Sequence, residues 1–245
     1  MTWFDRAPTW LAFVLMVAVA NAVALLATYV ARRWSHRMGV TSGPPVVSAW
    51  ATCAGGLTAL LFAFTIVTVW NSAARAKSNV DDEAAAIRLV ARDIAPSQRA
   101  LLREYVNGTI AEWPALCGGV EDSKVDATLV ALQQAAKPRS PSYADDLYRQ
   151  LGTMEDLRNR RWQTSTSSIP GEIWVALLVL SFSVLVVLSL ALTDRPETHV
   201  VLTIAVATAL GTLFWVAAVL EYPFCGRTGI GPGELLDIVR AHLMS

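Results

Sequence analysis

The chain of 245 residues is 54% apolar and 16% charged, and its mean hydropathy is +0.43. This composition excludes an ordinary soluble domain and predicts an integral membrane protein, because so much apolar surface needs a lipid solvent. The formal net charge of zero provides no bulk electrostatic attraction to nucleic acid, so we expect no nucleic-acid partner.

Four apolar runs, residues 10–30, 50–69, 173–192 and 200–220, contain no Asp, Glu, Lys or Arg. Each is near the roughly 20 residues that a helix needs to span the hydrocarbon core. The first run could be read as the apolar part of a cleaved signal peptide, but it extends to Val30 and is too long for one. The sequence therefore predicts four transmembrane helices, and the first is a retained anchor.

The second apolar run continues into charged residues without a helix breaker. No Gly or Pro occurs from Leu57 to Ala95, and Pro96 follows directly. A helix of that length would be roughly 58 Å long, about twice the thickness of the hydrocarbon core. We therefore predict a single helix that spans the membrane and extends well beyond it.

Most of the charged residues lie between the second and third apolar runs. Apolar residues recur there at helical spacing in four stretches, and no stretch alternates like a strand. The predicted fold class is an all-α integral membrane protein with four transmembrane helices and a helical soluble insertion between the second and third. The predicted domains are 1–73 (transmembrane helices 1 and 2), 74–168 (soluble insertion), 169–222 (transmembrane helices 3 and 4) and 223–245 (C-terminal turn and short helix).

An even number of spans places both termini and the insertion on one side of the membrane. Lys and Arg residues near membrane ends favour the cytoplasmic side, and more of them flank the insertion than the opposite loops. We therefore expect the termini and the insertion in the cytoplasm, although the cluster from Arg32 to Arg37 favours the reverse orientation. The three cysteines, Cys53, Cys117 and Cys225, show no paired spacing, which predicts reduced thiols.

Residue types that carry catalytic or metal-binding chemistry form no motif in this sequence. None of the three histidines, His36, His199 and His242, has a second ligand three or four residues away. The glycines of residues 226–233 match neither common phosphate-binding pattern. We therefore expect no enzyme activity, no catalytic residue, no metal and no cofactor. The spans also lack the ionisable residue that ion-coupled transport usually needs, so a passive pathway is favoured over a transporter.

One face of the second apolar run is a candidate pore lining. Thr58, Phe62, Thr65, Val69 and Ser72 recur at a helical period, and Phe62 would form a narrow apolar ring that excludes water. Hydroxyl residues are equally common where membrane helices pack together, so helix packing is an alternative role for this face. A neighbouring face is a second candidate for the lining, with Leu57, Leu61, Phe64 and Thr68.

Four separated elements of the sequence carry a family resemblance. They are Trp70 with NVDDEAAAIRLV, then LLREYVNGTIAEWP, then IPGEIW, and finally LEYPFCG. In these elements the chain resembles the bestrophin-like domain-of-unknown-function membrane proteins of bacteria. Tyr222 is a departure, because the family has a basic residue at that position of the last element. The residues that match the family motif are Glu83, Tyr105, Glu112, Trp113, Pro114, Pro223, Phe224 and Gly226.

The resemblance implies a homo-oligomeric bestrophin-like ion channel of the bacterial inner membrane, with anions as the conducted ions by analogy. The second transmembrane helix would line the pore, and its extension would form a cytoplasmic vestibule. The implied partners are further copies of the chain, membrane lipid and inorganic ions. The alternative is a membrane-anchored interaction or sensing module without conductance, because a helical insertion is equally able to bind a cytoplasmic partner.

Overall fold

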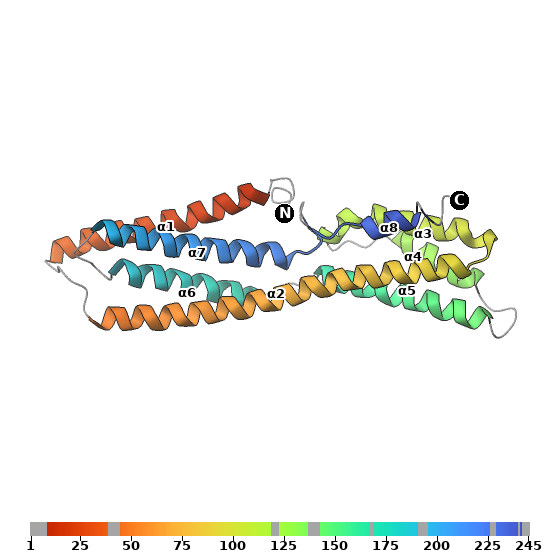
Figure 1. Cartoon of the computed structure of the whole chain (residues 1–245), viewed down its shortest axis with the longest axis horizontal. Helices are drawn as coiled ribbons and strands as arrows, with labels where there is room; N and C mark the ends of the chain where they lie inside the picture. The colour runs from red at the N-terminus through yellow and green to blue at the C-terminus, as the bar shows by residue number, and fades with distance from the viewer. Residues whose placement is uncertain are drawn as a thin grey trace. The chain divides into compact units, whose positions relative to one another are not determined.

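The described part of the chain consists of helices and connecting turns, without a β-strand (Figure 1). It forms two compact units, one from Met1–Trp70 with Ser168–Glu221 and one from Asn71–Ser167 with Tyr222–Ser245. We refer to them as the membrane unit and the helical unit. The computed structural model describes residues 9–38, 45–118, 123–136, 143–166, 169–190, 196–225, 229–239 and 241.

The membrane unit contains α1 (Thr9–Met38), the first part of α2 (Pro45–Asp93), α6 (Gly171–Leu190) and α7 (Pro196–Glu221). All four helices are long and apolar enough to cross a membrane. The four spans predicted from the sequence are therefore present as helices, and the chain is an all-α membrane protein. Within the unit, α1 packs along α7 and also contacts α6.

Small and hydroxyl-bearing residues let the helices of the membrane unit approach closely. A Cβ atom added at Gly211 of α7 would lie 3.0 Å from the Cα atom of Val17 in α1. Nearby, the Asn21 amide donates to the Thr208 hydroxyl over 3.0 Å. Packing of this kind replaces the hydrophobic effect, which provides no driving force between helices in lipid.

The helix α2 runs unbroken from the apolar sequence into the charged sequence, as predicted. It contains 49 residues and ends at Asp93, shortly before Pro96 starts a short 3₁₀ turn, η1 (Pro96–Gln98). A proline cannot donate the next helical hydrogen bond, which explains why the helix stops there. The same helix therefore contributes residues to both units.

The helical unit is built around the charged half of α2. It also contains η1, α3 (Arg99–Ala111), the 3₁₀ helix η2 (Trp113–Gly118), α4 (Ser123–Ala135), α5 (Tyr143–Thr166) and α8 (Gly233–Ile238). The apolar stripe of α2 enters the core of this unit. The residues that follow α7, which we call the C-terminal segment, enter the same core and therefore belong to this unit. Core residues from α2 and α8 include Ala76, Val80, Ala84, Ile87, Leu235 and Ile238.

The cysteine prediction was wrong for two of the three residues. Cys117 in η2 and Cys225 after α7 form a disulfide, although 108 residues separate them in the chain. Their spacing in the sequence gave no indication of pairing, because the two segments meet only when the C-terminal segment docks on the helical unit. Cys53 in the membrane unit is free and exposed.

Candidate functional site

The face of α2 predicted to line a pore lies inside the membrane unit. Thr58, Phe62, Thr65 and Val69 are each at most 3% exposed, and Ser72 is half-buried. In the single chain, these residues therefore pack within the unit. Burial of this kind disfavours a lining between chains, and the pore-lining role stays a prediction.

Two contacts explain why this face is buried. The ring of Phe62 meets the ring of Phe214 from α7 edge to face, with 5.0 Å between their centroids. The hydroxyl of Thr58 donates to the carbonyl of Ala54 over 2.7 Å, so it needs no water. A threonine that is satisfied by its own helix backbone packs as readily as an apolar residue.

A neighbouring face of α2 is exposed. Leu57 is 58% exposed and Phe64 is 74% exposed. Thr68 is also exposed, and so are Asn71 and Arg75 in the part of α2 that belongs to the helical unit. Of the second candidate lining, Leu57, Phe64 and Thr68 are exposed, whereas Leu61 is half-buried and packs against the core of the membrane unit.

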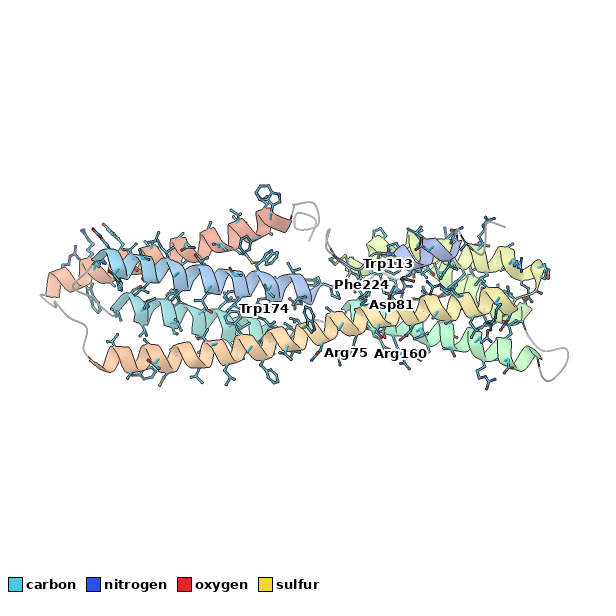
Figure 2. All side chains as sticks on the ribbon, in the orientation of Figure 1. Arg75, Asp81, Trp113, Arg160, Trp174 and Phe224 are labelled. Carbon is cyan, nitrogen blue, oxygen red and sulfur yellow. A yellow bond between two sulfur atoms is a disulfide. The ribbon has the colours of Figure 1, made fainter. Side chains whose placement is uncertain are left out.

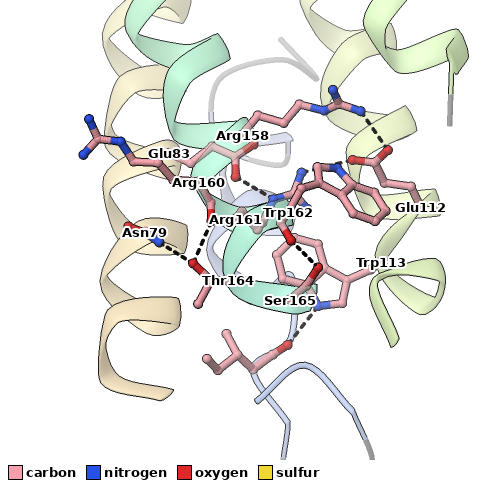
Figure 3. Close-up of polar contacts among 11 residues, drawn as sticks. Asn79, Glu83, Glu112, Trp113, Arg158, Arg160, Arg161, Trp162, Thr164 and Ser165 are labelled. Carbon is pink, nitrogen blue, oxygen red and sulfur yellow. Dashed lines mark hydrogen bonds and ion pairs between the residues drawn. The ribbon is translucent and has the colours of Figure 1, made fainter. Parts of the chain in front are cut away.

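Four buried charged side chains form a second candidate site, within the helical unit. We call Glu83, Glu112, Arg158 and Arg161 the ion cluster (Figure 3). Arg161 Nε lies 2.8 Å from Glu83 Oε2, and its Nη2 lies 3.0 Å from Glu112 Oε1. Arg158 Nη2 lies 3.1 Å from Glu112 Oε2. Glu112 therefore bridges two guanidinium groups, and the four charges sum to zero.

Burial and neighbouring charges shift the pKa values of groups around the ion cluster. Desolvation raises the pKa of the buried Tyr105 phenol, which therefore stays neutral. For Arg158, burial acts to lower the pKa, but the hydrogen bond and charge of Glu112 outweigh it and raise the pKa. Arg158 also pairs with Asp126 at the edge of the unit.

Trp113 connects the ion cluster to the C-terminal segment. The guanidinium carbon of Arg161 lies 4.8 Å from the centroid of the Trp113 ring, a cation–π contact. On its other sides, Trp113 donates from Nε1 to the Ile230 carbonyl over 2.8 Å and meets the Phe224 ring at 6.0 Å (Figures 2 and 3). Residues that are far apart in the sequence thus form one continuous set of contacts.

The structure brings together most of the residues that carried the family resemblance. Glu83, Tyr105, Glu112, Trp113 and Phe224 all lie in or against the ion cluster and its Trp113 contact. The other three differ in position: Pro114 is exposed, Pro223 is buried, and Gly226 lies outside the described residues.

Arg158 and Arg161 were not predicted as site residues, because their position near the third apolar run is also typical of basic residues that flank a membrane span. A signal was present in their spacing. Leu151 and Met154 lie on the buried face of α5, and Arg158 follows at the same helical interval. An arginine that continues an apolar stripe indicates a buried partner, since an unpaired buried charge is costly.

Of the three histidines, the structure describes the side chain of His199. His199 is buried at the start of α7, where its Nε2 lies 2.9 Å from the Leu188 carbonyl oxygen. The side chain of His36 and all of His242 lie outside the described residues. Among the residues that the structure does describe, no three His, Cys, Asp or Glu side chains are grouped to hold a metal ion.

Four apolar helices and a helical unit with a buried ion cluster define an α-helical membrane protein that crosses the bilayer several times. The sequence matches the family model of the bestrophin-like domain over residues 18–235. The chain therefore belongs to the bestrophin-like family, which confirms the resemblance found in its motifs. No protein with a curated description matches the sequence.

Solved structures of bacterial bestrophin homologues share this fold. One from Klebsiella pneumoniae matches with a TM-score of 0.70 and 13% identity, over 94% of this chain and 97% of that chain. Two point variants of the homologue from the same organism match at 13% identity. Their TM-scores are 0.71, over 98% of both chains, and 0.72, over 95% of this chain and 97% of that chain. At this level of identity, the likeness concerns the fold.

Proposed function

We propose that this protein is a homo-oligomeric ion channel whose pathway is lined by the exposed face of α2. The observation that carries the proposal is a stripe of exposed residues along that helix. We define the stripe as Leu57, Phe64, Thr68, Asn71 and Arg75. At about 100° per residue, its members lie within an arc of about 60°.

The chemistry of the stripe changes along the helix in the way a pathway requires. Leu57 and Phe64 are apolar, Thr68 offers a hydroxyl and Asn71 an amide, and Arg75 ends the stripe with a positive charge. A ring of Phe64 side chains from several copies would form a narrow apolar constriction, which gates by dewetting. The polar residues that follow would replace part of the hydration shell of an ion.

The proposal requires several copies, because side chains fill the described interior of a single membrane unit. Its interior is filled by Phe62, Leu177, Leu185, Leu210 and their neighbours. A ring of chains, each presenting the stripe of α2, would surround a space that one chain cannot. Membership of a family with solved bestrophin homologues supports this arrangement.

The proposed ions are anions, and the proposed orientation is cytoplasmic for the helical unit in the bacterial inner membrane. Arg75 supports the choice of anions, since a positive charge at the end of a pathway raises the local concentration of anions. Arg75 would supply the positive charge that the family has at the position where this chain has Tyr222. The balance of Lys and Arg residues supports the orientation, and the charged half of α2 would then form the wall of a vestibule.

The test compares two phenylalanines of α2 in protein reconstituted into liposomes. We expect Phe64→Ala to raise ion flux, because it removes the apolar constriction. It should change the free energy of unfolding by no more than about 0.5 kcal/mol, since the ring is exposed in the single chain.

The matched control is Phe62→Ala, which removes a buried ring. It should lower the free energy of unfolding by about 3 to 5 kcal/mol and leave the residual flux per folded protein near the wild-type value. Flux equal to that of empty liposomes for the wild type and both variants would contradict the channel and favour the interaction module.

A further inference from the structure

The disulfide between Cys117 and Cys225 joins two parts of the helical unit that are distant in the sequence. Cys117 lies in η2, and Cys225 lies in the turn that directly follows α7. The covalent bond therefore closes a loop of 108 residues. Both cysteine residues are half-buried, so neither is fully enclosed by the helical unit.

The disulfide is one of several attachments of the C-terminal segment, whose described residues are 222–225 and 229–239. The Phe224 ring and the Ile230 carbonyl both contact Trp113, at 6.0 Å between ring centroids and 2.8 Å from Nε1. Glu234 pairs with Arg88 of α2. These contacts are non-covalent, so they weaken cooperatively once the covalent link is lost.

The segment is attached to the part of the helical unit that holds the ion cluster. Cys117 lies in the same short helix as Trp113, and Glu112 directly precedes that helix. Glu112 in turn holds both Arg158 and Arg161. A change in how firmly the segment is bound is thus transmitted first to Trp113 and its guanidinium contact.

We propose that the Cys117–Cys225 pair is a site of reversible thiol–disulfide exchange, with a dithiol reductant as its reaction partner. A thiolate of the reductant attacks one sulfur, the S–S bond breaks, and the other cysteine leaves as a thiolate. The second thiol of the reductant then attacks the mixed disulfide. Two electrons and two protons pass to the pair, which becomes two thiols, while the reductant becomes a disulfide.

Exchange at this site controls how firmly the C-terminal segment is bound to η2. In the cytoplasmic orientation proposed above, cellular reductants act on accessible disulfides, and those that form there are usually transient or redox-sensing. The pair connects the chain that leaves the fourth span to the helical unit. Its reduction therefore loosens the segment and leaves the membrane helices unchanged.

The first measurement identifies the oxidised pair in purified full-length protein. Iodoacetamide added before reduction should label only Cys53, the free cysteine. After dithiothreitol treatment of the folded protein, it should label all three cysteines. Labelling of Cys117 and Cys225 in air-oxidised protein, or resistance of the folded protein to dithiothreitol, would overturn the proposal.

The second measurement is hydrogen exchange on the oxidised and reduced forms. We expect amides of residues 229–239 to exchange at least about tenfold faster after reduction, and amides of α6 to be unchanged. Reoxidation with diamide should restore the slow exchange. Equal exchange of residues 229–239 in both forms, or failure of reoxidation to restore protection, would contradict a reversible attachment.

Substitutions provide matched controls for the same measurement. The double variant Cys117→Ser, Cys225→Ser should exchange like the reduced wild type and be insensitive to dithiothreitol. Cys53→Ser should respond to dithiothreitol as the wild type does. A double variant that still responds would place the redox effect elsewhere and reject this pair. Because the oxidised and reduced wild-type forms are compared directly, the result is independent of ion conductance.

Discussion

Glu112 is the residue on which the ion cluster depends, because its carboxylate accepts hydrogen bonds from two buried guanidinium groups. Its Oε2 lies 3.1 Å from Arg158 Nη2, and its Oε1 lies 3.0 Å from Arg161 Nη2. A buried ion pair contributes little beyond a well-packed apolar replacement. Loss of one partner is costly, however, because the remaining charges stay buried without compensation.

We predict that Glu112→Ala lowers the free energy of unfolding by about 3 to 5 kcal/mol, because it leaves Arg158 and Arg161 with an excess of buried positive charge. Denaturant unfolding in detergent, followed by circular dichroism, measures the change. The control is Asp126→Ala, which removes a partly exposed carboxylate from Arg158 and should cost at most about 1 kcal/mol. Equal losses for the two variants would contradict a central role for Glu112.

At the scale of single elements, α2 matters because one helix presents different faces along its length. Phe62 is buried in the membrane unit, and Glu83 is buried in the helical unit. Phe64 and Arg75 lie on the exposed stripe. The same helix therefore contributes buried and exposed residues to each unit.

We predict that Ala74→Pro lowers the free energy of unfolding by about 3 kcal/mol, because proline removes a helical hydrogen bond and its ring clashes with the preceding turn. Ala74 is exposed, so the effect is confined to the backbone. The matched substitution Ala74→Gly should cost about 1 kcal/mol. If unfolding curves placed the two variants at the same stability, α2 would not be a continuous helix at this position.

The charge at the end of the stripe leads to a prediction about ion preference. Arg75→Glu should lower the ratio of anion to cation permeability by about fivefold, as expected for charge changes worth about 1 kcal/mol in water. Reversal potentials in planar bilayers measure this ratio.

The control for that experiment is Lys77→Glu. Lys77 is exposed and lies about 140° from Phe64 around the helix, away from the stripe. It should leave the permeability ratio unchanged. A change of similar size in both variants would mean that the stripe does not face the pathway and that only the overall charge acts on the ions.

For the whole molecule, assembly is the property on which the proposed function depends. The exposed apolar surface of the membrane unit includes Leu57, Leu60, Phe64, Val67 and Trp70 on α2. In a monomer, lipid would cover this surface. In a ring of chains, part of it would line the pathway and part would contact the neighbouring chain.

We predict that the protein purified in mild detergent has the mass of several chains, each of 26.5 kDa, after correction for bound detergent. Light scattering coupled to size-exclusion chromatography measures this mass. A stable species of a single chain would argue against the channel, because side chains fill the described interior of one membrane unit. Dithiothreitol should leave the mass unchanged, since the disulfide lies within one chain.

The sequence alone determined the four spans, the continuity of α2 and the family. Runs of apolar residues and the absence of Gly and Pro are local properties, so they can be read without knowing which segments meet. The motifs also identified Glu83, Tyr105, Glu112, Trp113 and Phe224 as a set. They did not identify Arg158 and Arg161, whose roles depend on partners from other helices.

Only the tertiary structure decided which face of α2 is buried and which cysteines are paired. The hydroxyl of a threonine such as Thr58 can donate a hydrogen bond to a backbone carbonyl of its own helix. The residue type therefore does not distinguish a face that packs against other helices from a face that contacts water. Phe62 and Phe64 are identical in type, and their environments differ because Phe62 packs against Phe214 and the rest of the membrane-unit core, whereas Phe64 is exposed. Likewise, Cys117 and Cys225 become neighbours only when the C-terminal segment docks, because residues 108 apart in the chain have no local interaction.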